Sequence, residues 1–306
     1  MREKALLNFV TRVQADKLGV EAVAVADGEK LLFEHHFIPR PARLIYSHTK
    51  SFTSTAVGFA IAEGKLSLTD RPVDFFPEAL PKEIDEGWKN VTLRDCLMMA
   101  SGVGQALLMG SKRYMGEGFP DYVKYLFSHP LLYKPGERHF YNNGDTYLCG
   151  RMVEKVTGKT LSAYLYEKMF KKMEIGYPAW EIDPQGHAFG ASGLCLEISN
   201  MIKLGQLYVA NGVWNGEQLL DPAWVKEAGA RQIGIANEGE PGDNWRCGYG
   251  YQFWKLGYPG SFRADGAYGQ ITAILPEKGL TISVQCPEDG NFELVKPVYM
   301  ELMENI

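Results

Sequence analysis

Patterns typical of β-strands are confined to the two ends of this 306-residue chain. Residues 20–26 show the alternating pattern of a strand, Asp27-Gly28 form a turn, and the strand pattern resumes over residues 30–36. This predicts a β-hairpin. Between Ser67 and Pro184 strand patterns almost vanish. Further strands are predicted over residues 43–46, 250–254, 261–264, 270–275 and 280–285. The sequence therefore predicts an α+β fold: an antiparallel sheet built from both chain ends and flanked by helices, with an inserted all-helical subdomain.

The helical middle of the chain divides the predicted fold into two parts. We expect residues 1–66 and 185–306 to form the sheet domain and residues 67–184 to form the inserted helical subdomain. A long irregular loop over residues 103–118 is expected to border the cleft between them, where a ligand would bind. Helical periodicity predicts the helices that flank the sheet, over residues 3–17, 198–211, 222–230 and 291–304.

The composition narrows the class of protein. Apolar residues make up 45% and charged residues 23%, which is typical of a soluble globular protein. The net charge is −5, and the chain has neither a basic block nor an apolar run of bilayer-spanning length, so we expect no nucleic-acid or membrane partner. No signal-peptide core is visible, and the five cysteines are scattered. Both features favour the cytoplasm, although a trimmed export signal would leave no trace. The oligomeric state is unknown from the sequence.

The first candidate motif is Ser47-His48-Thr49-Lys50, where a strand-like run gives way to helical spacing. Lys50 follows Ser47 by one helical turn, so its side chain is expected beside the serine hydroxyl. A buried amine at a helix start loses its proton near neutral pH and can then act as a base toward the serine. The alternative is a helix-capping serine followed by a solvent-exposed lysine. In either case we expect His48 to be a packing or rim residue.

The second candidate motif is Tyr141-Asn142-Asn143, directly before a predicted helix. Tyr141 can pass a proton between nucleophile and leaving group if a nearby cation lowers its pKa. Asn143 can hold a substrate carbonyl or Lys50. The alternative is that Asn143 is an N-cap and Tyr141 is a packed ring.

The third candidate motif is a glycine-bearing strand edge, Ala264-Asp265-Gly266-Ala267-Tyr268. Glycine in a strand indicates a close backbone approach, as when a substrate pairs with the edge, and the alternative is a bulge or hairpin turn. Tyr114 and Tyr268 are candidates for the cleft wall, and His139 and His187 lie near predicted loops that could reach the cleft.

Together the three motifs, in this order, resemble the serine β-lactamase and penicillin-binding-protein-like hydrolases, most closely the class C β-lactamase-like esterases, amidases and peptidases. The resemblance implies the β-lactamase/transpeptidase-like fold and an acyl-enzyme mechanism. Ser47 would be the nucleophile, and Lys50 with Tyr141 would move the proton. The backbone N–H groups of Ser47 and Ala267 would form the oxyanion hole. Asn143, Asp265, Gly266 and Tyr268 are the remaining expected substrate-binding residues. No metal or cofactor is required, and the partner is a small-molecule or short-peptide substrate.

One departure from the family pattern bears on the substrate. Ala264 replaces the usual Lys or His, and Asp265 replaces the usual threonine, so binding of a substrate carboxylate is disfavoured unless Arg263, Arg246 or Arg231 substitutes. Asp265 could instead attract an amine. We therefore expect an esterase, amidase or D-amino-acid peptidase. The alternatives are a class C-like β-lactamase and a non-catalytic, penicillin-binding-like ligand sensor.

Overall fold

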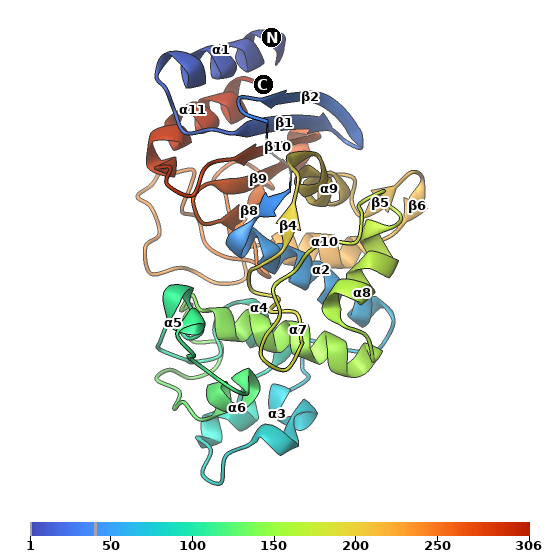
Figure 1. The fold of residues 1–306 in the computed structure, drawn as a ribbon, viewed down its shortest axis with the longest axis vertical. Coiled ribbons are helices and arrows are strands. Elements are labelled where there is room, and N and C mark those ends of the chain that lie inside the picture. The colour runs from blue at the N-terminus through green and yellow to red at the C-terminus, as the bar shows by residue number, and fades with distance from the viewer. Residues whose placement is uncertain (1, 40–41) are drawn as a thin grey trace.

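A six-stranded antiparallel sheet lies in the upper half of the computed structural model, which describes residues 2–39 and 42–306 (Figure 1). The strand order is β2-β1-β10-β9-β8-β7. The strands are β1 (Ala22–Asp27), β2 (Lys30–His36), β7 (Trp254–Lys255), β8 (Phe262–Gly266), β9 (Gln270–Leu275) and β10 (Leu280–Gln285). The sheet therefore joins an N-terminal hairpin to four C-terminal strands, as the strand patterns predicted.

Strand β1 joins the two chain ends through antiparallel pairing with β10, in which Val23 lies opposite Val284. Its valines and alanines point to opposite faces, and both faces are buried. The valines pack with the layer formed by helices α1 (Arg2–Ala15) and α11 (Phe292–Asn305). The small alanines allow helix α9 (Ile198–Val209) to lie directly against the other face of the sheet. The alternation in residues 22–26 thus gives a strand that is covered on both sides.

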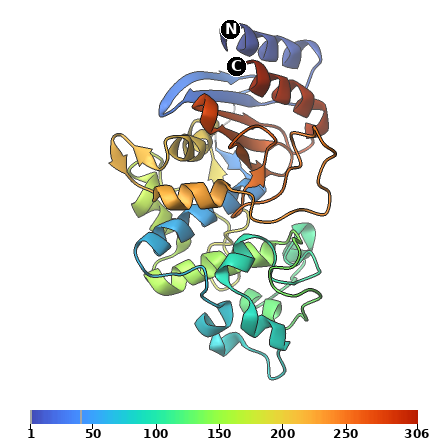
Figure 2. The ribbon, with the colours of Figure 1, turned by 180° about the vertical axis from the view of Figure 1, so that it is seen from behind.

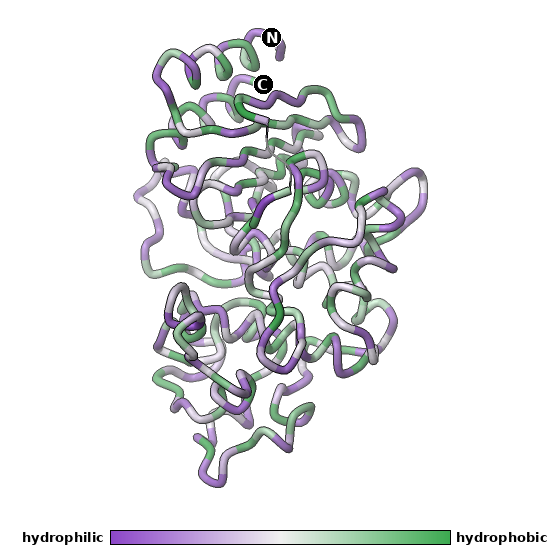
Figure 3. Tube along the Cα trace, in the orientation of Figure 1, coloured by the Kyte–Doolittle hydropathy of each residue, from purple (hydrophilic) through white to green (hydrophobic). Residues whose placement is uncertain are grey.

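The terminal helices α1 and α11 lie side by side over the outer layer, and the two chain ends meet there (Figures 1 and 2). Hydrophilic and hydrophobic residues alternate along α1 (Figure 3), as expected for a helix that buries one face. Helix α2 (Thr49–Ala62) lies on the opposite side of the sheet, against β8 and helix α7 (Asn143–Thr157). In the described residues, no helix has the length and apolar character needed to cross a membrane.

The middle of the chain is helical and occupies the lower half of the molecule in Figure 1. Helix α7 is its longest element, and Gly158 ends it in the left-handed conformation expected of a C-terminal glycine. The other helices of this region are α3 (Pro72–Phe75), α4 (Leu93–Leu97), α5 (Gly110–Tyr114), α6 (Tyr122–Phe127) and α8 (Leu161–Leu165). The boundaries at residues 66 and 185 stay a prediction.

Several elements differ from their sequence-based predictions. The loop over residues 103–118 contains α5, so it is only partly irregular. The strand predicted over residues 250–254 begins only at Trp254, because Gln252 has a positive φ of 65° that interrupts an extended strand. The short strands outside the main sheet are β3 (Arg43–Leu44), β4 (Cys195–Leu196), β5 (Val213–Trp214) and β6 (Glu217–Gln218), and the remaining helix is α10 (Pro222–Gly229).

Candidate active site

Ser47 lies on a single 3-10 turn, Tyr46–His48, between β3 and α2. The turn is held on both sides. The Ile45 amide donates to the Leu194 carbonyl (2.9 Å), and the buried His48 ring bonds through Nε2 to the Thr272 hydroxyl (2.8 Å). His48 is therefore a packing residue, and burial lowers its pKa to about 3. The Ser47 side chain lines the large cleft described below.

Lys50 lies one helical turn after Ser47, and its side chain is only 2% exposed. Its amine donates to Ser47 Oγ (3.1 Å), Asn143 Oδ1 (2.6 Å) and the Ala191 carbonyl (2.7 Å). Burial lowers the pKa of Lys50 well below its ordinary value, and the positive charge of Arg113 lowers it further. The alternative of a solvent-exposed lysine is therefore wrong. The amine has acceptors for all of its protons and a reduced tendency to stay charged.

Tyr141 also contacts the Ser47 hydroxyl, through a side-chain hydrogen-bond interaction. Its ring stacks on Trp254, with centroids 5.5 Å apart, and the Lys50 amine lies 5.1 Å from its centroid. Burial raises the pKa of Tyr141, and the contact with Ser47 only partly opposes this effect. The expected lowering of the Tyr141 pKa by a nearby cation is therefore wrong. The nearby amine is that of Lys50, which is itself disfavoured as a cation. The phenol stays protonated at neutral pH.

The two adjacent asparagines at the start of α7 have different roles in the structure. The Asn142 side chain is the N-cap and accepts from the Asp145 amide (2.8 Å). Asn143 is not a cap: its Oδ1 accepts from Lys50, and its Nδ2 donates to the Leu108 carbonyl (2.8 Å). The N-cap alternative for Asn143 is therefore wrong, and Asn143 links α7 to Lys50.

Gly266 ends β8 where this strand touches the Ser47 turn. A Cβ atom at Gly266 would lie 2.2 Å from the Ile45 carbonyl oxygen and 3.1 Å from the His48 amide nitrogen. The predicted close backbone approach is therefore present, and the approaching backbone belongs to the chain itself. Residues 267–269 also form the β8–β9 hairpin turn, so the alternative interpretation of the motif is correct as well. Ala267 follows Gly266 at the rim and lines the cleft.

The Asp265 carboxylate is ion-paired with Arg263, with Nε and Oδ2 2.9 Å apart. Burial raises the pKa of Asp265, and Arg263 opposes that shift. Ala264 points the other way, into the core between the sheet and α2. The Arg263 guanidinium lies over the Trp245 ring, 3.8 Å from its centroid. The expectation that Asp265 would repel a carboxylate or attract an amine is therefore weakened, because Arg263 offsets its charge.

A cleft of about 900 Å³ opens over Ser47. The motif residues that line it are Ser47, Tyr141, Asp265 and Ala267. One wall of the cleft is aromatic and apolar and comprises Met109, Phe140, Ile235, Trp245, Trp254 and Met300. This wall was not identified from the sequence. These residues come from separate segments with no shared pattern, apart from Phe140, which adjoins the Tyr141 motif.

Of the tyrosine and histidine candidates outside the motifs, His139 lines the cleft, and burial lowers its pKa to about 4. Two of the three candidate arginines, Arg246 and Arg263, line it as well. Tyr114 is not part of the cleft wall: it is 71% exposed and packs on Arg113. Tyr268 also lies outside the lining and packs edge-to-face on Tyr46, with centroids 5.1 Å apart. Arg231 pairs with Glu238 away from the cleft.

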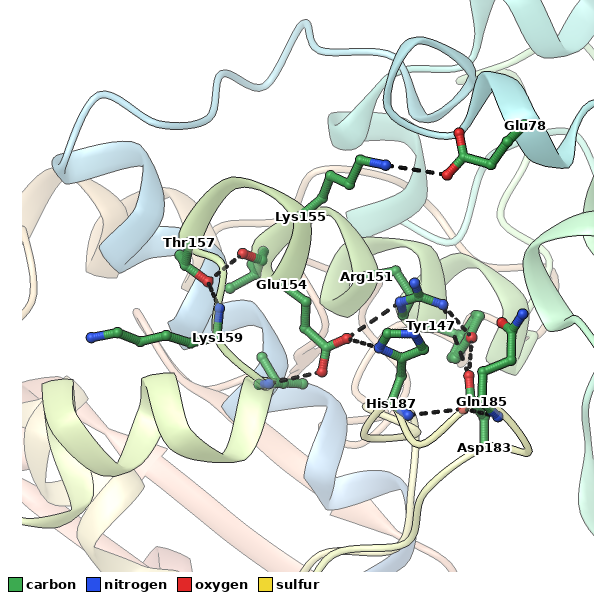
Figure 4. Close-up of polar contacts among 12 residues, drawn as sticks. Glu78, Tyr147, Arg151, Glu154, Lys155, Thr157, Lys159, Asp183, Gln185 and His187 are labelled. Carbon is green, nitrogen blue, oxygen red and sulfur yellow. Dashed lines mark hydrogen bonds and ion pairs between the residues drawn. The ribbon is translucent and has the colours of Figure 1, made fainter.

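His187 belongs to a polar network on α7 instead of the cleft (Figure 4). Its ring nitrogen Nδ1 lies 2.7 Å from the Glu154 carboxylate, and its backbone amide donates to Asp183 (2.9 Å). Tyr147 donates to the same Asp183 carboxylate, and Arg151 donates to the Tyr147 hydroxyl (3.0 Å). The network fastens the turn over residues 183–187 to α7. Among the described residues, no cluster of three or more His, Cys, Asp or Glu side chains could hold a metal ion.

Comparison with known proteins places this arrangement in a family. The model of the family described as Beta-lactamase matches residues 8–296. The N-acetylmuramyl-L-alanine amidase of Bacillus subtilis (strain 168) is 25% identical over 150 residues, which cover 44% of this chain and 34% of the amidase. The 6-aminohexanoate-dimer hydrolase of Paenarthrobacter ureafaciens is 25% identical over 271 residues, which cover 82% of this chain and 68% of the hydrolase.

A solved structure shows the same fold. The putative 6-aminohexanoate-dimer hydrolase from Bacillus anthracis superposes with a TM-score of 0.79 at 20% identity, covering 96% of this chain and 80% of its own. The match to the family model spans nearly the whole sequence, and the fold agrees with it. The chain therefore belongs to the beta-lactamase family.

Proposed function

We propose that this protein hydrolyses an ester or amide bond through an acyl-enzyme formed on Ser47. The observation that carries the proposal is the position of the Lys50 amine, which is buried, disfavoured as a cation and 3.1 Å from the Ser47 hydroxyl. A serine needs such a base before it can attack a carbonyl carbon. The names of the related amidase and dimer hydrolase agree with this reaction class.

The acylation step uses both neighbours of Ser47. Neutral Lys50 takes the hydroxyl proton as Ser47 Oγ bonds to the carbonyl carbon. Tyr141, a neutral phenol because burial raises its pKa, donates its proton to the leaving alcohol or amine as the scissile bond breaks. The proton on Lys50 then returns to Tyr141 through the shared contact with Ser47. Water attacks the ester carbonyl in the second half-reaction, and the acid product leaves with Ser47 restored.

The oxyanion of the tetrahedral intermediate needs donors beside Ser47. We assign this role to the backbone N–H groups of Ser47 and Ala267. The supporting observation is the tight approach of Gly266 to the Ile45 carbonyl, which brings the end of β8 next to the Ser47 turn. Each such donor commonly contributes about 3 kcal/mol to the stabilisation of the transition state.

The charges of the cleft restrict the substrate. Six of its charged side chains form three local pairs: Arg246 with Asp243, Arg263 with Asp265, and Lys296 with Glu293. Arg138 is the remaining charged residue of the lining, and among the described residues it has no acidic partner. The aromatic wall favours an apolar acyl or leaving group. We therefore propose a small-molecule or short-peptide substrate whose flank is apolar and either neutral or anionic.

The test combines turnover with mass spectrometry. The wild type is expected to cleave p-nitrophenyl esters and to be labelled once by a fluorophosphonate. Ser47→Ala should lose both properties. Ser51→Ala is the matched control, because Ser51 lies one turn after Ser47, at the start of α2, and its hydroxyl donates to the Gln252 carbonyl (2.7 Å). Full turnover by Ser47→Ala would contradict the proposal. A stable acyl adduct with an ester or a penicillin would favour the ligand-sensor or slow β-lactamase alternative.

A further inference from the structure

Among the described residues, Arg113 on the short helix α5 is the one positively charged side chain that lowers the pKa of Lys50. Arg113 is 6% exposed although it lies in a segment whose sequence predicts an irregular loop. Its guanidinium donates to both carboxylate oxygens of Glu181, from Nη2 at 2.7 and 2.8 Å and from Nε at 3.1 Å. It also lies over the Phe189 ring, 3.9 Å from its centroid. Neither Arg113 nor Glu181 lines the cleft, so neither is placed to touch substrate.

The contacts of this ion pair converge on the acceptors of the Lys50 amine. Arg113 Nη1 donates to the Leu108 carbonyl (3.3 Å), which also accepts from Asn143 Nδ2 (2.8 Å). The Asn143 side chain is thereby oriented with its oxygen toward Lys50. The Arg113–Glu181 pair therefore holds Asn143, the first acceptor of the Lys50 amine, through the shared Leu108 carbonyl.

The second acceptor is fixed through the Glu181 backbone. The Glu181 carbonyl accepts from the Phe189 amide (2.8 Å), and the Glu181 amide donates to the Gly193 carbonyl (3.0 Å). Ala191, whose carbonyl accepts from Lys50, lies between these two bonds. Arg113 thus connects α5, the Glu181 segment and the Ala191 segment around one amine.

We propose that the Arg113–Glu181 ion pair is a positioning device for Lys50: it orients the Asn143 and Ala191 oxygens that hold the amine beside Ser47. The opposite charges of the pair also act on that amine. The inference rests on the proposed function, because Lys50 matters only as a base. Arg113 and Glu181 are positioning residues, not catalytic ones.

The electrostatic part of the proposal has a sign for each partner. Burial lowers the pKa of Lys50, and the positive charge of Arg113 lowers it further. Glu181 is the ion-pair partner of Arg113, so we expect its negative charge to oppose the effect of Arg113. The other titratable groups near the site face elsewhere or are neutral. Tyr141 remains a phenol, Asp265 on β8 pairs with Arg263, and Asp145 on α7 accepts from Ser101 (2.7 Å). Removing the charge of Arg113 should therefore raise the pKa of Lys50, and removing the charge of Glu181 should lower it.

The experiment measures the rate of Ser47 labelling by a fluorophosphonate, and kcat/KM for a neutral p-nitrophenyl ester, as functions of pH. Arg113→Met should move the acid limb of both profiles to higher pH, and Glu181→Gln should move it to lower pH, each by about one pH unit. Arg113→Lys keeps the charge but not the paired hydrogen bonds, so it should keep the limb near its wild-type position with a lower kcat. KM should change little, because neither residue lines the cleft.

Arg151→Met is the matched control. Arg151 is another poorly exposed arginine with acidic partners, Glu154 and Asp183, but it lies in the network of Figure 4 and is not among the charges that shift the pKa of Lys50. It should lower the melting temperature without moving the acid limb. Limbs that stay in place, or that move the same way in Arg113→Met and Glu181→Gln, would overturn the inference. Turnover or labelling that persists in Ser47→Ala would instead overturn the proposed function itself. Failure of the inference and failure of the proposed function can therefore be told apart.

Discussion

The Lys50 amine lies 3.1 Å from the Ser47 hydroxyl and donates its remaining protons to Asn143 and to the Ala191 carbonyl. An amine held in this way needs no solvent to satisfy it, so it can remain buried at 2% exposure. The same burial disfavours its charge. The relationship is what would allow Lys50 to act as the base that we propose.

The first prediction concerns pH. Lys50 acts as a base only when it is neutral, so kcat/KM should fall as the pH drops below the lowered pKa of Lys50 and should be constant above it, until Tyr141 ionises at strongly alkaline pH. Lys50→Met should reduce kcat by about 10²- to 10⁴-fold at every pH. Lys50→Arg should be equally inactive, because a guanidinium does not deprotonate in this range. Steady-state profiles from pH 5 to 10 check this, and an acid limb that survives in Lys50→Met would assign it to another group.

The second prediction separates the two asparagines at the start of α7. Asn142→Ala removes the N-cap, so it should lower the free energy of unfolding by about 1 kcal/mol and leave the pH profile unchanged. Asn143→Ala removes an acceptor of Lys50, so it should reduce kcat and shift the acid limb of the pH profile. Chemical denaturation and steady-state kinetics on both variants test the distinction. The assignment is wrong if the two variants exchange these effects.

The third prediction tests the backbone contact at Gly266. Gly266→Ala places a methyl group 2.2 Å from the Ile45 carbonyl, and a backbone atom cannot move aside as a side chain can. It should destabilise the protein by about 1–3 kcal/mol and reduce kcat, because the Ser47 turn must shift. Gly176→Ala is the control, since a Cβ there meets nothing within 4 Å. Differential scanning calorimetry and ester turnover provide the measurement. Wild-type values for both variants would refute the contact.

The fourth prediction concerns charge selectivity in the cleft. Mono-p-nitrophenyl adipate and its neutral methyl ester differ only in the terminal carboxylate. The ratio of interest is kcat/KM for the carboxylate divided by kcat/KM for the methyl ester. Arg138→Gln should lower this ratio, because it removes the cleft cation that lacks an acidic partner among the described residues. Arg246→Gln should change the ratio less, because the Arg246 guanidinium is already bonded to Asp243 and is less available to contact a substrate carboxylate. An equal loss in both variants would show that pairing does not decide the selectivity.

The sequence predicted those parts of the site that depend on local spacing. Lys50 lies beside Ser47 because both lie on one helical start, and helix α7 begins at Asn143 because Asn142 caps it. The antiparallel sheet was predictable from strands that alternate in hydropathy on either side of a helical middle.

The remaining parts depend on tertiary contacts. Ala191 contributes only a backbone carbonyl, which no side-chain pattern reveals. Arg113 is buried because Glu181, which lies 68 residues further along the chain, pairs with it. The direction of the Tyr141 pKa shift was missed because burial outweighs the neighbouring amine. Tyr114 shows the converse, an aromatic residue near the site that faces solvent.

The most direct test of the central claim is to trap the acyl-enzyme. A slowly hydrolysed ester is mixed with the protein, the reaction is quenched with acid during turnover, and the digested peptides are analysed by tandem mass spectrometry. We predict an acyl group on Ser47 that disappears when the substrate is exhausted and never forms in Ser47→Ala. An adduct on a different side chain, or steady turnover with Ser47 unmodified throughout, would contradict the account.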